Sequence, residues 1–559
     1  MIHIEERKTV KLPGETSLFV NFEYDPLIVD AVKQCSVAHY DKNTLTWEVP
    51  LTSLSFLIEH LSSFDDVELC FLEDVPPEPD NIFELSTYKT TPYQYQLEGI
   101  QYGLNHAKWL LLDAPGLGKT LQLIYLAQEL KEREGLKHCL IVCGLNTLKN
   151  NWKDEIHKHS DLSCMILGER FQPRKKAIRN GSVQERLEDL RNPIEEFFII
   201  TNIETLRNDE IIKELKKNKT NKIDMIVLDE GHVCKSPTST QGKNLLKLNA
   251  KYMILATGTV LMNSPLDAYV PLKWIGADRS TYTNFKFYYC NFTGPFNNII
   301  VGYRFMDILK DQLEKVSLRR NKDLLDLPEK TVITEYVDMN DKQSKFYENI
   351  TEGIVQQVDK VKMTTASVLA MVTRLRQATA CPSILTSENI PSSKIERATD
   401  LARQIIENGD KVIIFSTFKE SLRDLEEEFK DIEHVVCHGD IDDAEINKRR
   451  NYFQNDERCK LMLATWQKMG TGVTLNAASY EVFLDIPWTE AVFTQAQDRI
   501  HRIGSKKPVF IYNLVCKNTI DERVLELVQS KGAISDYVVD DIISPNAVES
   551  LKKYIEDLA

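Results

Sequence analysis

The chain has 559 residues, of which 42% are hydrophobic, and this predicts several domains with sizeable buried cores. Its formal charge of −14 argues at face value against a nucleic-acid partner, but the charge is uneven. Residues 1–85 carry −12, residues 536–559 carry −4, and the remainder carries +2. Net charge therefore does not exclude binding to a phosphate backbone, because basic clusters at 174–176 and 318–320 can hold one.

Cysteine usage and hydropathy indicate the compartment. Eleven cysteines are scattered without a C-x-x-C pair, which argues for a reduced intracellular protein and against a disulfide scaffold or structural zinc. The N-terminus has no apolar signal region, and the longest charge-free stretch, residues 287–303, is broken by Gly294 and Pro295. We expect a soluble, monomeric protein of the cytoplasm, or of the nucleus in a eukaryote, without a membrane span.

The pattern along the chain predicts the domains. An apolar helix at 26–32, a tyrosine turn and a tryptophan strand come first, and a proline-rich linker follows near residue 80. Short apolar strands then alternate with amphipathic stretches, which is typical of parallel α/β sheets. The expected strands are Trp109–Leu112, Cys139–Cys143, Phe197–Thr201, Met225–Leu228, Tyr252–Ala256, Lys411–Ser416, His434–Cys437, Lys460–Ala464, Glu481–Asp485 and Val509–Leu514.

The predicted fold class is therefore α/β, with two parallel-sheet lobes, a helical insertion and a small N-terminal accessory domain. The predicted domains are 1–85 (acidic N-terminal module), 86–279 (first lobe), 280–392 (mainly helical insertion), 393–535 (second lobe) and 536–559 (acidic tail).

The segment "DAPGLGKT", residues 113–120, lies between an expected strand and an expected helix. Amides at such a turn and helix N-terminus point at phosphate, and Lys119 supplies positive charge. The Thr120 hydroxyl is a candidate Mg²⁺ ligand. A plain turn before a helix is the alternative reading of this short match.

A carboxylate pair favours the nucleotide reading. Met225–His232 is an apolar strand that ends in Asp229 and Glu230, where Asp229 can complete a Mg²⁺ shell and Glu230 can orient and deprotonate water. The alternative is a solvated strand end. His232 either couples this pair to the block Thr257–Thr259 or satisfies a buried hydrogen bond.

With these two motifs, the chain resembles the SWI/SNF-type, helicase-like, DNA-dependent ATPases of helicase superfamily two. The resemblance covers roughly residues 90–530. The departures from the family pattern are Ala114, Pro115 and Val260. The matching blocks, in chain order, are "PYQYQLEGIQYGL", "DAPGLGKT", "LKNNWKDEI", "ITNIETLR", "LDEGHVCKS", "LATGTVLMNSPLDAY", "LRRNKDLLDLPEK", "LRQATACPSIL", "KVIIFSTF", "HGDI", "ATWQKMGTGVTLNAAS" and "QAQDRIHRIGS".

The resemblance implies two RecA-like lobes, ATP and Mg²⁺ as cofactors, and DNA as partner. It also implies that "LKNNWKDEI" and "ITNIETLR" track DNA. The catalytic residues it implies are Lys119, Asp229, Glu230, Gln495, Arg499 and Arg502, with Thr120 and Asp229 on the metal. The nucleotide-binding residues it implies are Gln96 (adenine), Pro115, Gly116, Leu117, Gly118, Lys119, Thr120, Gly470 and Gly472, the last two flanking Thr471.

Two of these motifs keep an alternative reading. Arg499 and Arg502 are three residues apart on an expected helix, so both project to one face and can act as arginine fingers, with Arg502 the better candidate. An ordinary basic helix face is the alternative. Gly470 and Gly472 either contact ligand or form a tight turn.

The N-terminal pattern Y-D-x-x-x-x-x-W-x-V-P, which begins at Tyr40, resembles the HARP-type module of the annealing-helicase branch. It is expected to be either an arm that recognises DNA structure or an acidic domain that only packs on the first lobe.

The function expected from this resemblance is an ATP-driven translocase on double-stranded DNA that remodels branched DNA or protein–DNA complexes. RNA polymerase recycling, nucleosome remodelling or another protein-displacing activity is an alternative within the motor class. A nucleic-acid-binding switch toggled by ATP is an alternative from another class.

Overall fold

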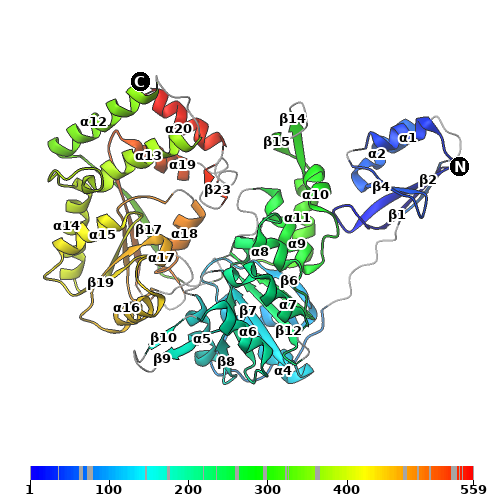
Figure 1. Cartoon of the computed structure of the whole chain (residues 1–559), viewed down its shortest axis with the longest axis horizontal. Coiled ribbons are helices and arrows are strands. Elements are labelled where there is room, and N and C mark those ends of the chain that lie inside the picture. Colours follow the sequence, from blue (N-terminus) through cyan, green and yellow to red (C-terminus); the bar gives the residue numbers. More distant parts are fainter. Residues whose placement is uncertain are drawn as a thin grey trace. The chain divides into compact units, whose positions relative to one another are not determined.

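The computed structural model describes residues 2–557 apart from short gaps, and the chain divides into two compact units. One unit consists of residues 1–114 and 119–320, and the other of residues 115–118 and 321–559. Figure 1 labels the elements of both. The undescribed residues are 1, 36, 62–66, 72–79, 145–147, 173–176, 180, 218–219, 235, 259–263, 294–298, 322–323, 325–326, 359–364, 470–474, 488–489, 503–504, 506, 530–537, 540–541, 544 and 558–559.

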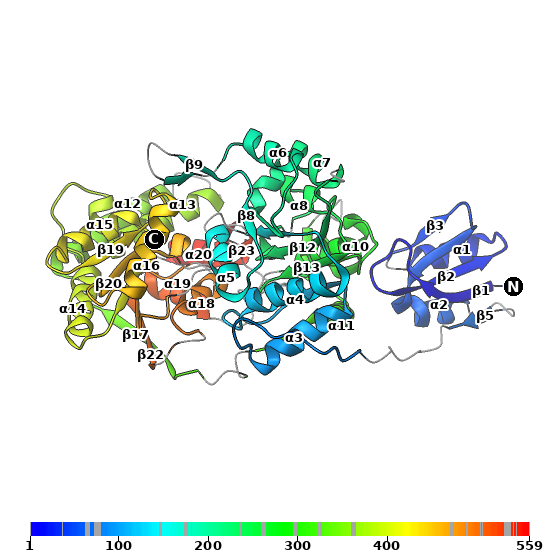
Figure 2. The same cartoon turned by 90° about the horizontal axis from the view of Figure 1, so that it is seen from below.

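The N-terminal module, drawn in blue in Figure 2, is a five-stranded sheet with two helices on one face. The predicted apolar helix is confirmed and begins after Asp25, whose carboxylate accepts the Leu27 N–H at 2.8 Å. The tryptophan strand is also confirmed. In sheet order the strands are β3 (His39–Asp41), β4 (Thr46–Pro50), β2 (Thr16–Phe22), β1 (Ile2–Lys8) and β5 (Val67–Cys70), and the helices are α1 (Pro26–Lys33) and α2 (Leu54–Leu61), with the turn η1 (Leu51–Ser53).

The first lobe is built on a seven-stranded sheet in which every pair of neighbouring strands is parallel. All five predicted strands are present, because their near-continuous apolar runs suit strands that are buried on both faces. In sheet order they are β16 (Ser317–Leu318), β6 (Lys108–Leu111), β13 (Tyr252–Ala256), β12 (Ile223–Asp229), β7 (His138–Cys143), β11 (Phe198–Asn202) and β8 (Cys164–Ile166).

Helices cover both faces of this sheet and create two apolar layers. One face packs against α3 (Gln94–Asn105), α4 (Lys119–Glu134) and α5 (Leu148–His159). The other face packs against α6 (Val183–Arg191), α7 (Asp209–Lys217), α8 (Thr240–Leu245), α9 (Tyr269–Ile275), α10 (Tyr282–Tyr289) and α11 (Met306–Lys315). Two hairpins, β9 (Arg170–Gln172) with β10 (Ala177–Arg179) and β14 (Cys290–Thr293) with β15 (Ile299–Tyr303), and the turns η2 (Ile203–Arg207), η3 (Gly231–Cys234) and η4 (Pro265–Ala268) complete the unit.

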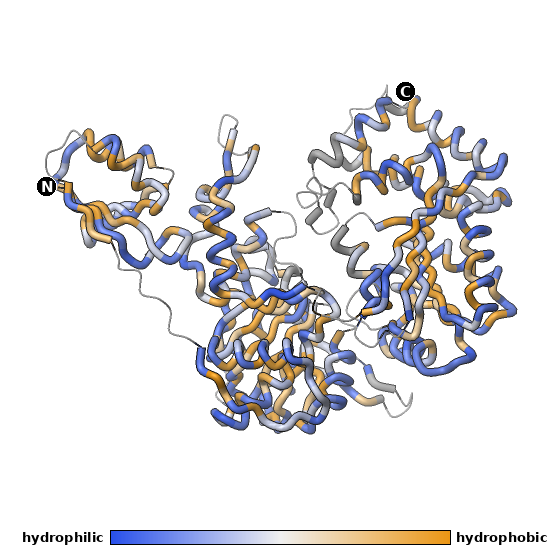
Figure 3. The backbone as a smooth tube through the Cα atoms, turned by 180° about the vertical axis from the view of Figure 1, so that it is seen from behind, coloured by the Kyte–Doolittle hydropathy of each residue, from blue (hydrophilic) through white to orange (hydrophobic). Residues whose placement is uncertain are grey.

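The second lobe repeats this plan with six parallel strands, and its five predicted strands are confirmed. In sheet order they are β17 (Lys330–Val337), β22 (Val509–Cys516), β21 (Tyr480–Phe483), β18 (Val412–Ser416), β20 (Leu461–Thr465) and β19 (His434–Cys437). The apolar colouring of the sheet strands in Figure 3 reflects their burial.

Helices again cover both faces. One face packs against α14 (Ser393–Glu407) and α15 (Lys419–Glu428). The other packs against α12 (Asp341–Val358), α13 (Thr365–Ala380), α16 (Asp443–Asn455), α17 (Trp466–Met469), α18 (Glu490–Gln497), α19 (Ile520–Gln529) and α20 (Pro545–Asp557). The turn η6 (Pro382–Ile384) and the short pair β23 (Val538–Val539) and β24 (Ile542–Ile543) are the remaining elements that the structure describes.

The interval 280–392, expected to be a mainly helical insertion, is shared between the two units. It contains α10 to α13, but β16 extends the first sheet beside β6, and β17 pairs with β22 in the second sheet. Neither strand shows an apolar run in the sequence, because β16 has only two residues and β17, "KTVITEYV", is mostly half-buried. Among the described residues, no helix is both long and apolar enough to cross a membrane.

One buried side chain in the second lobe lacks a hydrogen-bond partner. Glu481 on β21 has no exposed surface, and neither of its carboxyl oxygens has a partner among the described residues. Burial raises the pKa of this carboxyl well above its ordinary value, against the charges of Lys330 and Arg499 that lower it. Burial without a hydrogen-bond partner therefore disfavours the charged form of Glu481 in the folded protein.

We expect Glu481→Gln to stabilise the second lobe increasingly as pH rises. Because the pKa of Glu481 is raised in the folded state, its bound proton stabilises the folded protein fully at pH values below the unfolded pKa. This stabilisation is lost as the pH rises through the folded pKa. Glutamine needs no proton, so the free energy of unfolding of the variant relative to the parent should grow by up to about 1.4 kcal/mol per pH unit. Urea unfolding followed by circular dichroism at about pH 5 and about pH 8 measures it.

The matched control is Glu129→Gln, because Glu129 is equally buried but accepts hydrogen bonds from Ser86, Tyr88 and Arg133. The free energy of unfolding of that variant should fall by about 1–3 kcal/mol, because the groups that donate to Glu129 lose a charged acceptor. A Glu481→Gln protein less stable than the parent at the higher pH contradicts the assignment.

Candidate functional site

The loop between β6 and α4 has the backbone that its sequence predicts. Gly116 and Gly118 have φ angles of 92° and 77°, a left-handed region in which glycine avoids the strain of a side chain. Leu117 between them is fully buried. Helix α4 begins at Lys119, so the first-turn amides stand where the loop ends, the arrangement that binds anions.

Asp113 stabilises this loop from inside the lobe. Its carboxylate is fully buried and accepts two hydrogen bonds from Arg320, at 2.9 and 2.6 Å, and one from Gln122 at 3.0 Å. The Arg320 guanidinium also donates to the Gln122 amide oxygen at 2.7 Å and to the Tyr95 carbonyl, and lies 5.3 Å from the centre of the Tyr95 ring. Asp113 thus joins the loop to α3, α4 and the segment after β16.

Backbone pairing strengthens the same connection. The Ala114 N–H donates to the Arg320 carbonyl at 2.9 Å, which continues the parallel pairing of β6 and β16. Arg320 belongs to the cluster 318–320 that the sequence offered as a phosphate-binding patch. Its side chain is only 9% exposed and is engaged with Asp113, so Arg320 does not serve that role. The cluster 174–176 lies outside the described residues.

The predicted carboxylates lie at the carboxyl end of β12. Asp229 is the last residue of the strand, and its carboxylate accepts the indole N–H of Trp152 on α5 at 2.8 Å. Burial raises the pKa of Asp229 to about 6, the Glu230 charge adds to this, and Trp152 and Lys119 oppose it. Strands β6, β13 and β12 are parallel neighbours in one sheet, so the loop that follows β6 and Asp229 at the end of β12 lie at the same sheet edge.

Glu230 has a φ of 53°, a left-handed conformation that is strained for a residue with a side chain. Gly144, at the end of β7, makes room for it, since a methyl group on Gly144 would lie 2.9 Å from the Glu230 Cβ. The register pairs Asp229 with Cys143, so the two strand ends are neighbours. Sequence reasoning missed both Gly144 and the contact of Trp152, because each depends on this tertiary pairing.

Lys119 and Thr120 are placed as the sequence predicts, at the start of α4. The Lys119 ammonium donates to the Asp113 carbonyl at 2.8 Å, which holds it over the loop. The hydroxyl of Thr120 and the carboxylate of Asp229 are hard oxygen donors of the kind that Mg²⁺ prefers. A buried carboxyl whose pKa is raised also gains from a cation, so this donor set fits Mg²⁺.

Gln96 lies in the first turn of α3 and is 2% exposed. Its side-chain oxygen accepts the Tyr93 N–H at 2.9 Å and so caps the helix. Gly99, one turn later, lets α3 approach α4, because a methyl group there would lie 2.0 Å from the Gln122 side-chain oxygen. Gln96 is therefore held beside the Asp113 network, and its reading of adenine stays a prediction.

The arginine motif of the second lobe differs from the expectation in one respect. Helix α18 ends at Gln497, so Arg499 and Arg502 do not share a helix face and the prediction of a common helix is wrong. The helix ends because the Arg499 N–H turns back to the Ala496 carbonyl, while its own carbonyl accepts the Leu475 N–H. Arg499 is 4% exposed, and Arg502 is half-buried with its N–H donating to the Ser505 hydroxyl.

Several predicted residues fall outside what the structure describes. Gly470, Thr471 and Gly472 lie in the undescribed stretch 470–474, and Thr259 lies in 259–263. Gln495 lies on α18 and His232 on η3, but their side chains are not described.

A polar cluster that sequence reasoning also missed holds the edge of the second sheet. Asp485, which follows β21, accepts hydrogen bonds from the Ser416 hydroxyl at 2.6 Å and the Thr417 amide at 3.0 Å. The buried Arg376 guanidinium lies 3.3 Å from the same carboxylate. The Trp466 indole donates to the Thr417 hydroxyl at 3.0 Å. Residues from four separate sequence blocks thus meet here.

Several known proteins are similar to this chain over most of its length. An uncharacterized ATP-dependent helicase of Mycoplasma pneumoniae is 29% identical over 499 residues, which is 86% of this chain and 45% of that protein. The ISWI chromatin-remodeling complex ATPase ISW1 of Saccharomyces cerevisiae is 26% identical over 475 residues, 80% of this chain and 40% of that protein. The DNA repair and recombination protein RDH54 of the same species is 27% identical over 490 residues, 77% of this chain and 51% of that protein.

The chain spans about half or less of the length of these curated relatives. A solved structure described as the Sulfolobus solfataricus SWI2/SNF2 ATPase core in complex with dsDNA aligns with a TM-score of 0.37 and 24% identity, over 86% of this chain and 98% of that one. A model of the helicase conserved C-terminal domain matches residues 393–504. The model of the SNF2-related domain matches residues 40–384, more than half of the chain, and the protein therefore belongs to the SNF2 family.

Proposed function

We propose that this protein is an ATP-dependent translocase on double-stranded DNA that remodels branched DNA or protein–DNA complexes. The observation that carries the proposal is the sheet edge where the glycine loop, Lys119, Asp229 and Glu230 come together. Family membership supports DNA as the partner, and two relatives are named for chromatin remodelling and for DNA repair and recombination.

Each of these residues has a separate proposed role in ATP hydrolysis. The loop amides and the Lys119 ammonium bind the phosphates of ATP, and Glu230 orients the attacking water and accepts its proton. Mg²⁺, held by Thr120 and Asp229, would neutralise charge on the phosphate oxygens. Gln495, Arg499 and Arg502 are proposed to contribute from the second lobe, with Arg502 stabilising the transferred phosphoryl group. Gly470 and Gly472 are proposed to link the nucleotide state to the grip on DNA.

The N-terminal module supports a finer proposal, that the protein selects branched DNA as HARP-type proteins do. Its support is the Tyr40–Trp47 element, whose rings lie 5.0 Å apart on neighbouring strands. The alternative, a domain that only packs on the first lobe, is favoured by contacts of Lys11 with Asn284 and of Glu15 with Lys315. Deleting residues 1–85 separates them, because only a selecting arm removes a preference for forks over plain duplex.

Glu230→Gln should keep ATP binding and lower turnover by about 10²–10⁴-fold, since the general base is lost while the phosphate contacts stay. Lys119→Ala should weaken nucleotide binding itself. ATP binding by calorimetry and hydrolysis by phosphate release measure the two effects. Near-normal hydrolysis by Glu230→Gln rules out the assignment.

Trp152→Phe should lower turnover about tenfold while keeping the fold, because it removes one hydrogen bond to a carboxylate and leaves the ring buried. Trp109→Phe is the matched control. Trp109 is equally buried in the first lobe, but its indole N–H has no partner among the described residues. Equal effects of the two substitutions on turnover would show that Trp152 acts through packing alone.

Arg502→Ala should leave ATP affinity nearly intact and lower kcat by about 10³-fold or more, because a finger acts mainly on the transition state. Steady-state hydrolysis and nucleotide-binding titrations give the two numbers. The prediction fails if residues 86–275 alone hydrolyse ATP as fast as the whole chain.

DNA-stimulated hydrolysis should fall steeply as salt rises from about 50 mM to about 200 mM, because phosphate contacts release counterions. DNA sequence should matter little, since backbone contacts position a protein without reading bases. ATPase rates on duplex, single-stranded and forked DNA and on RNA, at matched salt, measure this. If no nucleic acid changes the rate while a protein partner does, the nucleotide-switch or protein-displacing alternative takes its place.

A further inference from the structure

Two neighbouring strands of the N-terminal sheet carry metal-binding side chains on one face. Strands β1 and β5 are parallel, and their register pairs His3 with Glu68 and Glu5 with Cys70. Ile2 and Ile4, which alternate with His3 and Glu5, are buried in the core of the module. Because residues in register on parallel strands share a face, the four side chains gather on the side opposite that core.

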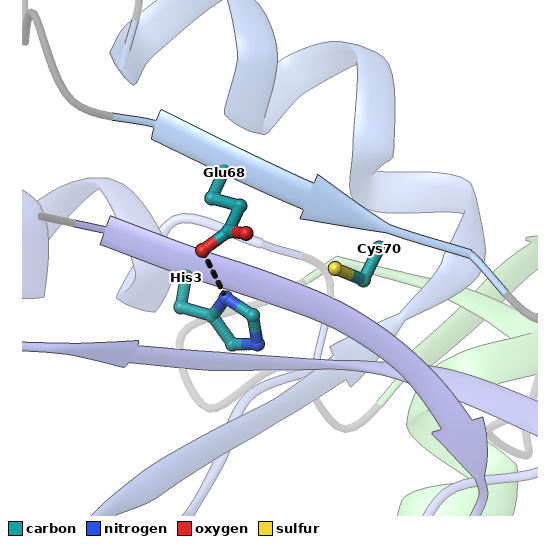
Figure 4. A group of neighbouring side chains, drawn as sticks. All are labelled: His3, Glu68 and Cys70. Atoms are coloured by element: carbon teal, nitrogen blue, oxygen red, sulfur yellow. Dashed lines mark hydrogen bonds and ion pairs between the residues drawn. The ribbon is translucent and has the colours of Figure 1, made fainter.

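The donor atoms of three of these side chains are close together (Figure 4). The His3 ring nitrogen Nδ1 lies 3.1 Å from the Glu68 carboxylate. One ligand atom each from His3, Glu68 and Cys70 can be chosen so that all lie within 4.8 Å of one another. His3 is 37% exposed, Glu68 is 58% exposed and Cys70 is half-buried, so an ion from solvent can reach them.

We propose that His3, Glu68 and Cys70 form a binding site for Zn²⁺ or a similar transition-metal cation. A thiolate with an imidazole disfavours Mg²⁺ and Ca²⁺, which take oxygen ligands, and suits zinc. A tetrahedral zinc with bonds of about 2.0–2.3 Å holds its ligand atoms about 3.3–3.8 Å apart. The three donors, which lie within 4.8 Å of one another, therefore have to close by about 1.5 Å at most, which rotation of partly exposed side chains accomplishes.

Glu5 has a supporting place in this site. Its carboxylate lies 3.6 Å from the other ring nitrogen of His3 and accepts a hydrogen bond from Arg7. A carboxylate on the second nitrogen orients the ring and makes the first a better ligand. Binding the metal displaces the proton of the Cys70 thiol, which passes to solvent.

The bound ion would tie down the edge of the sheet. Strand β5 is four residues long and is the edge strand next to β1. A metal joining His3 to Glu68 and Cys70 closes a loop of more than 60 residues, so it favours the folded module over the unfolded chain. The scattered cysteines argued against structural zinc, but this site needs only one cysteine and is assembled by strand pairing.

A hydrogen-bonded cluster of His3 with two carboxylates is the competing explanation, and it gives Cys70 no role. Titration of the 559-residue chain, freed of any histidine tag, with Co²⁺ distinguishes the two. One equivalent of Co²⁺ should produce the near-ultraviolet thiolate-to-cobalt absorption, and Zn²⁺ should displace it. Cys70→Ser should abolish this absorption, and His3→Ala should weaken the apparent affinity at least about tenfold.

Cys164→Ser is the matched control, because Cys164 is also half-buried and lies 3.6 Å from a histidine nitrogen, that of His157. It should leave the cobalt absorption unchanged. Circular dichroism of each variant verifies folding. Absence of the thiolate band, or a band that survives Cys70→Ser, overturns the proposal. ATP hydrolysis is not the readout, so either result leaves the proposed motor function to its own tests.

Discussion

The first lobe depends on the buried ion pair between Asp113 and Arg320. These residues are more than 200 positions apart, yet their side chains and the Ala114–Arg320 backbone bond fix the base of the phosphate loop. Asp113 is fully buried and Arg320 nearly so, and leaving either charge unpartnered costs about 3–5 kcal/mol, whereas the intact network satisfies both. The aspartate where a simpler phosphate loop has glycine thus has a structural task, to hold the loop from behind.

The carboxyl end of β12 adds backbone strain to this base. Glu230 is kept in a left-handed conformation, and Gly144 leaves the space that its side chain needs. Asp229 is buried beside a second carboxylate, which makes its ionised form costly without a cation. A ligand that brings positive charge to this edge relieves part of that cost. The residue that gains from a cation, Asp229, is therefore adjacent to the residue with the strained backbone, Glu230.

The sequence predicted the parts whose signals are local. Apolar runs such as β7 and β13 indicate buried parallel strands, and the glycines at 116 and 118 indicate the loop. It could not predict β16, whose two residues gain their place only by pairing with β6. The contact of Trp152 with Asp229 and the end of α18 at Gln497 were also hidden, because each is decided by partners distant in the sequence.

The position of Trp152 has a spectroscopic consequence. Its indole N–H is bonded to the Asp229 carboxylate, which is proposed to ligate Mg²⁺. The charge next to an indole shifts its excited state, so on the proposed function the fluorescence of this ring, one of six tryptophans in the chain, would change when the site is occupied. Trp152 would then report on nucleotide binding without any added dye.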